Sequence, residues 1–417
     1  MGAGLKNKYG PWVSGEDFFD REREVGRLTE LIDDGNNVLV VAPRRVGKTS
    51  LIREAFQRME KRNRDYLLFV DVLHCSTPED VIAAASVVAL PYQALKEKII
   101  GVFSSFWKQF RENIESIGSS EVLEIKFREA LGGDWQAKGQ KIFGNLAEAD
   151  RCVAICFDEL PIMLTRLLTC SKEAEYQPKR NSADVFLTWL RHLMGEHQDK
   201  LRFIICGSIG LEPIVKRHGL SHTITQLRAF PLEPWSRETA EACLNALALK
   251  YNVKWADQAQ RTLLDHLGCY IPHHVQMFFG HMYEDSRKRN SNLLSLEDID
   301  RVYQTSMLST RGHAELADYE ERLLRVLERD SVTLALDLLT ETAVTGVLEP
   351  KTARLLSQSL PLQNSDAVLR EVLDILQHDG YLEWDDDKKV WLFVSYLVRD
   401  WWNKRFSQSY VPPQERR

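Results

Sequence analysis

One short segment, VLVVAPRRVGKTSLI from Val38 to Ile52, constrains the fold more than any other. Apolar residues typical of a buried strand run into a loop, and Ala42–Thr49 matches G-x-x-x-x-G-K-[ST] at every fixed position except the first. Such a loop points backbone N–H groups and a helix N-terminus at phosphate oxygens. Position 42 is at the strand exit, where alanine adds only one methyl group, so we expect it to be tolerated. The segment predicts a nucleotide-binding loop in an α/β fold.

Three residues of this loop carry the expected chemistry. Gly47 lets the backbone approach the phosphates closely, and Lys48 supplies a positive charge to the β- and γ-phosphates. The Thr49 hydroxyl is a ligand of the type that Mg²⁺ takes in such sites. We therefore expect ATP and Mg²⁺ as the cofactors of this chain.

A second candidate element is the apolar run that begins at Arg151 and ends in Asp158 and Glu159. A carboxylate at the end of a buried strand can hold the water shell of Mg²⁺, which is the role expected of Asp158. A carboxylate beside it can orient or deprotonate an attacking water, which is the role expected of Glu159. The alternative is an exposed acidic turn after an ordinary strand, but the phosphate loop upstream favours the catalytic interpretation.

A third element is the predicted strand Leu201–Cys206, which is followed by Gly207 and Ser208. A small polar residue at this place can respond to the γ-phosphate or to the attacking water. Ser208 is therefore a candidate catalytic residue, and the alternative is an ordinary loop serine.

Composition divides the chain into three zones, for which we predict domains at 1–235, 236–312 and 313–417. In the first zone, short apolar runs alternate with longer amphipathic segments, as in a parallel sheet flanked by helices. The predicted strands are Val38–Val41, Tyr66–Val72, Cys152–Phe157, Leu201–Cys206 and Ile224–Phe230. The second zone has no strand signal and predicts a small all-helical domain, with Ser236 and Ser295 as helix caps.

The third zone predicts a winged helix-turn-helix. An apolar stripe with i, i+3, i+4, i+7 spacing indicates a helix, and its members are Leu369, Val372, Leu373 and Leu376. This helix is expected to end near Gly380. Two strand-like runs, Tyr381–Trp384 and Val390–Val394, then flank an acidic turn and indicate a hairpin.

The cysteines and the apolar runs indicate where in the cell this protein is expected to reside. The seven cysteines are scattered, which is typical of a cytoplasmic protein, and Cys152 and Cys156 are expected to be buried on one face of a strand. The longest uncharged, mostly apolar run, Val81–Leu90, is too short to span a bilayer. The N-terminus lacks the apolar core of a signal peptide. We therefore expect a cytoplasmic protein with no membrane partner.

Together these segments resemble a P-loop ATPase of the AAA+/STAND group, specifically the archaeal-type ATPases related to replication initiators. The double-arginine loop APRRVGKTS, from Ala42, and the strand end FDELP, from Phe157, match the family's phosphate loop and Mg²⁺ strand. FPLEPWS, from Phe230, resembles the hinge into a helical lid. WLF and RDWW, from Trp391 and Arg399, resemble the end of a winged helix. The resemblance implies an α/β fold with a five-stranded parallel sheet in the AAA+ order, a helical lid, a winged-helix tail and ATP hydrolysis.

The resemblance also implies which residues surround the nucleotide. GEDFFDRE, which contains Phe19 and Arg21, is similar to the segment that packs on adenine. GCYIP is similar to the lid motif whose proline, here Pro272, lies against the base. Ala42 departs from the family's usual glycine. The residues expected to contact the cofactor are Phe19, Arg21, Ala42, Pro43, Arg44, Arg45, Val46, Gly47, Lys48, Thr49, Ser50 and Pro272.

The arginines leave alternatives open. Arg217 lies between the fourth and fifth predicted strands, in the interval where the family places an arginine finger, and Arg228 is the alternative. Either can equally be a surface or core-edge arginine. Arg44 and Arg45 are expected either to touch phosphate or to pair with nearby carboxylates. Because a finger that acts in trans requires assembly, the oligomeric state stays open as well.

Charge separates the function hypotheses. From Glu315 to the end the chain has 13 Lys and Arg against 19 Asp and Glu, and the wing tip begins with three aspartates at Asp385. Contact with a phosphate backbone needs a basic face, so tight binding of duplex DNA is disfavoured. The preferred hypothesis is a slow ATPase switch that positions its winged helix on the core, on a protein partner or by self-association. The alternatives are an initiator-like DNA-binding ATPase, with a basic surface near Arg287–Arg289 or Lys179–Arg180, and a nucleotide-locked scaffold.

Overall fold

The computed structural model describes residues 5–103, 119–169, 173–309, 314–327, 329–361 and 363–415. The chain forms two compact units. One, which we call the sheet unit, contains Arg21–Val41 and Lys48–Leu232; the other, the helical unit, contains the described residues of Met1–Asp20, Ala42–Gly47 and Glu233–Arg417. The nucleotide-loop motif is thereby divided, because Ala42–Gly47 belongs to the helical unit and Lys48 to the sheet unit.

The sheet unit is built on a five-stranded parallel sheet with the order β2-β3-β4-β1-β5. Its strands are β1 (Asn37–Val41), β2 (Asp65–Asp71), β3 (Cys152–Asp158), β4 (Leu201–Cys206) and β5 (Leu227–Pro231). All five predicted strands and the AAA+ order are therefore confirmed. The last strand starts three residues later than predicted, because Ser221–Ile224 forms the 3₁₀ turn η2.

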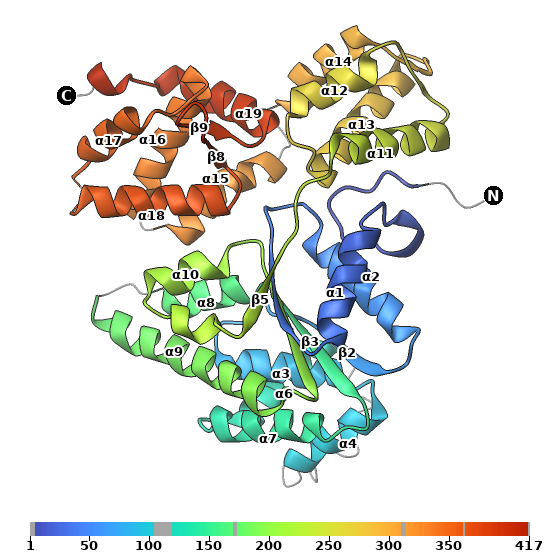
Figure 1. The fold of residues 1–417 in the computed structure, drawn as a ribbon, viewed down its shortest axis with the longest axis vertical. Helices are drawn as coiled ribbons and strands as arrows, with labels where there is room; N and C mark the ends of the chain where they lie inside the picture. Colours follow the sequence, from blue (N-terminus) through green and yellow to red (C-terminus); the bar gives the residue numbers. More distant parts are fainter. Residues whose placement is uncertain are drawn as a thin grey trace. The chain divides into compact units, whose positions relative to one another are not determined.

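Helices cover both faces of this sheet, as is usual where crossover helices connect parallel strands. Their bounds are α1 (Glu22–Asp33), α2 (Lys48–Glu60), α3 (Pro78–Ala89), α4 (Gln93–Val102), α6 (Ser120–Leu131), α7 (Trp135–Ala147), α8 (Leu160–Leu168), α9 (Glu173–Glu196) and α10 (Leu211–Arg217). Figure 1 shows α1 and α2 together on one side of the sheet and α8 and α9 together on the other. The long segment between β2 and β3 contains α3, α4, α6 and α7, as its helix-like sequence predicts.

The helical unit contains the remaining helices. After the 3₁₀ turn η1 (Gly15–Asp17) they are α11 (Arg237–Tyr251), α12 (Ala259–Leu267), α13 (Pro272–Lys288), α14 (Leu296–Val302), the π-helical turn η3 (Tyr303–Met307), α15 (Ala314–Val326), α16 (Arg329–Thr345), α17 (Pro350–Gln358), α18 (Ser365–His378), α19 (Tyr396–Phe406) and the 3₁₀ turns η4 (Ser407–Ser409) and η5 (Pro413–Glu415). Ser236 caps α11, and Ser295 forms a capping box with Asp298 on α14. Both predicted caps are confirmed.

Two short strands correct the prediction of an all-helical second zone. β6 (Lys254–Trp255) and β7 (Leu293–Leu294) pair in parallel within it. Each has only two residues, which is too short to produce an alternating pattern in the sequence. The predicted hairpin is confirmed as β8 (Leu382–Asp385) and β9 (Val390–Phe393) in antiparallel register.

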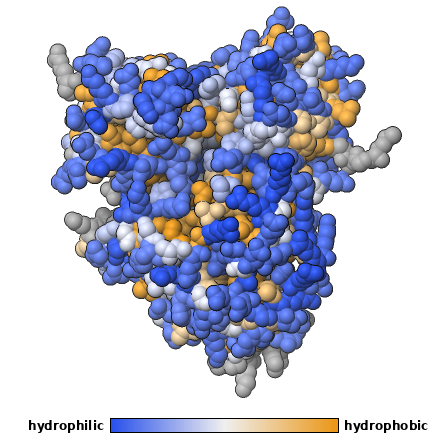
Figure 2. Space-filling model, in the orientation of Figure 1, coloured by the Kyte–Doolittle hydropathy of each residue, from blue (hydrophilic) through white to orange (hydrophobic). Residues whose placement is uncertain are grey.

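The helical unit has one connected apolar core. Its buried side chains are Leu5 and residues from Trp235 to Trp402, and they include Phe278, Tyr303 and Tyr381. The predicted boundary at 312 and 313 lies outside the described residues, so the three-domain division stays a prediction. The surface in view in Figure 2 is mostly hydrophilic, and no described helix is long and apolar enough to cross a membrane.

Candidate functional site

The end of β3 places Asp158 beside the first turn of α2. β3 is buried along nearly its whole length and pairs in parallel with β2 and β4, which explains its continuous apolar run. The Thr49 hydroxyl donates a 3.0 Å hydrogen bond to Asp158 Oδ2. The two residues that were predicted as Mg²⁺ ligands are therefore neighbours in the sheet unit.

This pair fits the chemistry of a Mg²⁺ ion that accompanies a nucleotide. Hydroxyl and carboxylate oxygens are hard ligands, and Mg²⁺ in such sites takes one or two carboxylates together with phosphates and waters. Among the described residues there is no group of three or more His, Cys, Asp or Glu side chains that could hold a metal ion. Thr49 and Asp158 are two such oxygen ligands, and phosphate and water would supply the others.

Glu159 is held by the end of β4. It has a left-handed backbone, with φ of 65°, at the start of α8, and its N–H donates to the Cys206 carbonyl at 2.9 Å. Its Oε2 accepts hydrogen bonds of 2.8 Å from both the backbone N–H and the hydroxyl of Ser208. Burial raises the pKa of Glu159 above its ordinary value, although the bonds from Ser208 oppose that shift. The structure therefore brings Ser208 to the candidate base.

Lys48 completes the predicted group in the sheet unit. It is the first residue of α2 and only 8% exposed. Its positive charge acts on Glu159 and favours the ionised carboxylate. Ser50, also predicted to contact the cofactor, follows in the same first turn and is half-buried. Lys48, Thr49, Asp158 and Glu159 thus form one polar cluster at the ends of α2 and β3.

The loop Ala42–Gly47 has the backbone that its sequence requires. Gly47 has φ of 104°, a region that residues with a Cβ rarely adopt. Ala42 does not have a positive φ, so a glycine is not needed there on conformational grounds. Arg45, in contrast, has a positive φ of 62°, which is a strained conformation for a residue that is not glycine. Val46 lies between Arg45 and Gly47 and is buried.

Both loop arginines are engaged by the helical unit. Arg44 forms an ion pair with Asp318 of α15, and burial together with the charges of Arg45 and Arg322 lowers the pKa of Arg44 to about 10. Arg45 Nη1 lies 2.5 Å from His273 Nε2 in α13. Burial and the charge of Arg45 lower the pKa of His273 to about 2, so the neutral ring accepts from the guanidinium. Arg44 therefore pairs with a carboxylate, and its contact with phosphate stays a prediction.

The turn between α18 and β8 adjoins the same loop. Gly380 has φ of 75°, and a Cβ at that position would come within 2.9 Å of Pro43 Cβ. Next to this glycine, Asp379 pairs with Arg322 of α15 at 2.9 Å, and both side chains are almost fully buried. The Tyr381 hydroxyl donates to the Tyr319 carbonyl at 2.6 Å. Pro43 and Arg44 therefore contact a buried part of the helical unit.

The residues predicted near the base lie in different surroundings. Phe19 packs edge-on against Trp235, with ring centroids 5.8 Å apart. Pro272 is buried as the first residue of α13, directly before His273. Arg21 belongs to the sheet unit, where it is buried and bonds Glu24 at 2.9 Å. Phe19 and Pro272 are thus both parts of the helical unit, and their contact with a base stays a prediction.

The two candidate arginine fingers differ in their setting. Arg217 is the last residue of α10 and is half-buried. Arg228 lies in β5 and is exposed. Neither role is tested by this geometry, so both stay predictions.

Sequence reasoning missed three residues that contact the site. Asp318 and His273 bind the loop arginines, and the Cys206 thiol donates to Asp158 Oδ1 at 3.0 Å. Asp318 and His273 are each more than 200 residues away from their arginine in the sequence, so no local pattern predicts the contacts. Only the position of Cys206, at the end of a predicted strand beside the acidic strand, was a usable signal.

Comparison with known proteins agrees with this arrangement. A family model described as an ATPase domain found predominantly in Archaea matches residues 18–218. A Walker-type ATPase of Pyrococcus abyssi has a TM-score of 0.62 and 16% sequence identity, and the match covers 95% of this chain and 99% of that one. The ORC2 protein of Aeropyrum pernix, in its ADPNP and ADP complexes, has a TM-score of 0.51 and 12% identity, covering 94% and 98%. No curated protein sequence matches. At these identities, the two structures establish a shared fold.

Proposed function

Because a model of a predominantly archaeal family of ATPase domains matches residues 18–218, we propose that the chain is a Mg²⁺-dependent ATPase switch. Its nucleotide state would alter how the loop Ala42–Gly47 contacts α13 and α15. The helical unit would transmit that change to a protein partner or to a second copy of the chain. Turnover would be slow without such a partner.

The catalytic part of the proposal assigns one task to each side chain of the sheet-unit cluster. Lys48 neutralises charge on the β- and γ-phosphates. Thr49 and Asp158 would hold Mg²⁺, which would supply further charge neutralisation on the phosphates. Glu159 orients an attacking water and takes its proton. Ser208 holds the Glu159 carboxylate in one orientation through two hydrogen bonds.

The switch part rests on one observation, the pairing of both loop arginines with side chains of the helical unit. A phosphate group is the natural competitor for a guanidinium that is bound to a carboxylate or an imidazole. Nucleotide binding would therefore change the stability of the pairs of Arg44 with Asp318 and of Arg45 with His273. A ligand shifts a conformational equilibrium only through such differential contacts.

The proposal is tested by steady-state ATP turnover, with Lys48→Ala as the blank, in the presence and absence of duplex DNA. We expect slow, Mg²⁺-dependent turnover that Lys48→Ala removes and that DNA does not change. Turnover that persists in Lys48→Ala would contradict the assignment of the loop.

An initiator-like DNA-binding ATPase is the second candidate, and one surface favours it. A groove of about 650 Å³ lies between α17 and the hairpin, and its cationic lining residues are Lys351, Arg354, Lys388 and Lys389. Cationic side chains that line a groove are the type that contacts a nucleic-acid backbone. Two of them are already paired, however, since Lys388 contacts Asp385 at 3.2 Å and Lys389 contacts Asp386 at 3.3 Å.

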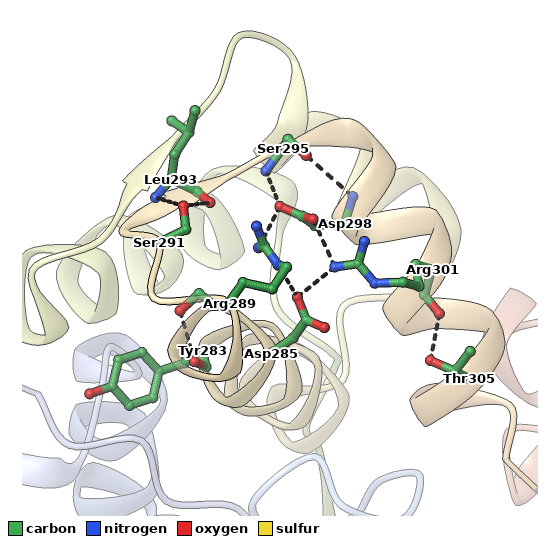
Figure 3. Close-up of polar contacts among 10 residues, drawn as sticks. Tyr283, Asp285, Arg289, Ser291, Leu293, Ser295, Asp298, Arg301 and Thr305 are labelled. Atoms are coloured by element: carbon green, nitrogen blue, oxygen red, sulfur yellow. Dashed lines mark hydrogen bonds and ion pairs between the residues drawn. The ribbon is translucent and has the colours of Figure 1, made fainter.

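Arginines of the two basic runs that the alternative hypothesis named are engaged by contacts within the chain. Figure 3 shows Arg289 bridging Asp285 and Asp298, at 2.7 Å from each. Arg301 bonds the same two carboxylates. In the other run, Arg180 donates to the His218 carbonyl at 2.9 Å. These pairings favour the protein-coupled switch, and strong DNA stimulation of turnover that fades with added salt would reverse the ranking.

A further inference from the structure

The carboxylate of Asp158 is held from both sides. Its Oδ2 accepts from the Thr49 hydroxyl, and its Oδ1 accepts from the Cys206 thiol, each at 3.0 Å. Asp158 is 7% exposed and Cys206 is fully buried. The thiol and the hydroxyl therefore each bind a different oxygen of the same carboxylate.

The sheet itself fixes this contact. Asp158 and Cys206 are partners in the parallel register of β3 and β4. The backbone around them is tied on both sides, because Val72 N–H donates to the Asp158 carbonyl at 3.0 Å and Glu159 N–H donates to the Cys206 carbonyl at 2.9 Å. A side chain at position 206 thus faces the carboxylate without any loop movement, and only its last atom decides whether a hydrogen bond forms.

A second cysteine provides a built-in comparison. Cys156 lies two residues before Asp158 on β3, is fully buried, and has its sulfur 4.0 Å from the Cys206 sulfur. The burial predicted for Cys156 is confirmed. Cys152, which was predicted to be buried as well, is only half-buried. Both thiols are fully buried, but the 3.0 Å bond to Oδ1 comes from Cys206.

We propose that Cys206 is a positioning residue that orients the Asp158 carboxylate for the Mg²⁺–nucleotide complex. The thiol hydrogen fixes Oδ1 and so leaves Oδ2 directed toward Thr49. Partners of this kind, which hold a metal ligand without touching the metal, commonly change metal affinity by about tenfold or more when they are removed. This inference rests on the proposed nucleotide hydrolysis.

The test compares three variants of the full chain: Cys206→Ala, which removes the donor, Cys206→Ser, which keeps one, and Cys156→Ala, which removes the neighbouring thiol. The first readout is the Mg²⁺ concentration that gives half-maximal ATP turnover. The second is the affinity for a fluorescent ATP analogue, measured with Mg²⁺ and with EDTA. Thermal unfolding of each variant accompanies both.

We expect Cys206→Ala to raise the half-maximal Mg²⁺ concentration by roughly tenfold and to weaken nucleotide binding with Mg²⁺ while leaving binding in EDTA unchanged. Cys206→Ser should stay within about twofold of the wild type, because a hydroxyl donates as well as a thiol. If Cys206→Ala and Cys156→Ala behave alike in Mg²⁺ dependence, the thiol only packs and the inference fails while the proposed function stands. A wild-type chain whose nucleotide binding ignores Mg²⁺ would overturn both.

Discussion

The two halves of the nucleotide-loop motif differ in what their side chains contact. In Ala42–Gly47, the charged side chains are bound by Asp318 and His273 of the helical unit. In the following turn, the Thr49 hydroxyl donates a hydrogen bond to Asp158, and the positive charge of Lys48 acts on Glu159. One continuous motif is thus shared between a part arranged for chemistry and a part arranged for contact with helices.

This difference indicates how a loop of this kind could couple nucleotide binding to contacts with the helical unit. Gly47 and Lys48 are consecutive residues, so under the proposed switch a change in the loop backbone would pass into the first turn of α2. The strained backbone of Arg45 is compatible with that role, because a residue with positive φ holds its conformation only while its surroundings support it. The predictions below separate the two halves, from the largest expected effect to the smallest.

Glu159→Gln should break the chemical half alone. We expect turnover to fall by about 10²- to 10⁴-fold, since an amide cannot take a proton from water, while ATP affinity stays within a few fold. Binding is measured with a labelled nucleotide and turnover by phosphate release. Wild-type turnover in this variant would remove Glu159 from the mechanism.

Asp379→Asn should destabilise the buried part of the helical unit that contacts the loop Ala42–Gly47. It leaves the Arg322 guanidinium without its carboxylate at a position that is almost fully buried, which typically costs ~3–5 kcal/mol of stability. Denaturant unfolding measures the loss. The matched control is Asp33→Asn, which breaks an exposed pair with Arg62 and should cost less than ~1 kcal/mol.

A double variant sharpens that result. Arg322→Met combined with Asp379→Asn removes both charges, so it should recover much of the stability that Asp379→Asn loses. If the double variant is less stable than Asp379→Asn alone, Arg322 stabilises the helical unit through contacts other than this ion pair.

The difference between the halves also explains what sequence could predict. β3 is an apolar run that ends in two carboxylates, and Lys48 and Thr49 sit in a motif of fixed spacing, so local pattern was enough to bring them together. The contacts of Arg44 and Arg45 depend on residues in α15 and α13, and such tertiary pairs have no local signature. β6 and β7 were missed for a related reason, since two residues cannot show a period.

Acid should weaken the helical unit through His273 and His274. Burial lowers their pKa values to about 2 and about 3, whereas an unfolded histidine has a pKa near 6.5. Below about pH 6.5 the unfolded chain therefore binds protons that the folded chain does not, and stability falls as pH falls. The loss approaches ~1.4 kcal/mol per pH unit for each histidine.

This pH dependence is measured by denaturant unfolding at pH 7.5, 6.5 and 5.5. His274 is fully buried and Met is a hydrophobic residue of comparable length, so His274→Met should remove about half of the slope between pH 6.5 and 5.5. An unchanged slope in that variant would mean that other groups, such as carboxylates of the sheet unit, set the acid sensitivity.

The smallest expected effect is the one that bears most directly on the switch. Asp318→Asn removes the anionic partner of Arg44 on α15 and should free the guanidinium for phosphate. Because the pair is partly exposed, at 23% and 14% for its two side chains, the gain in ATP affinity should be no more than about fivefold. Glu321→Gln, on the same helix but paired with Arg325 in an exposed position, is the control and should leave affinity unchanged. If Asp318→Asn instead binds ATP more weakly at unchanged thermal stability, then Asp318 holds Arg44 in its productive position, and the pair assists nucleotide binding rather than competing with it.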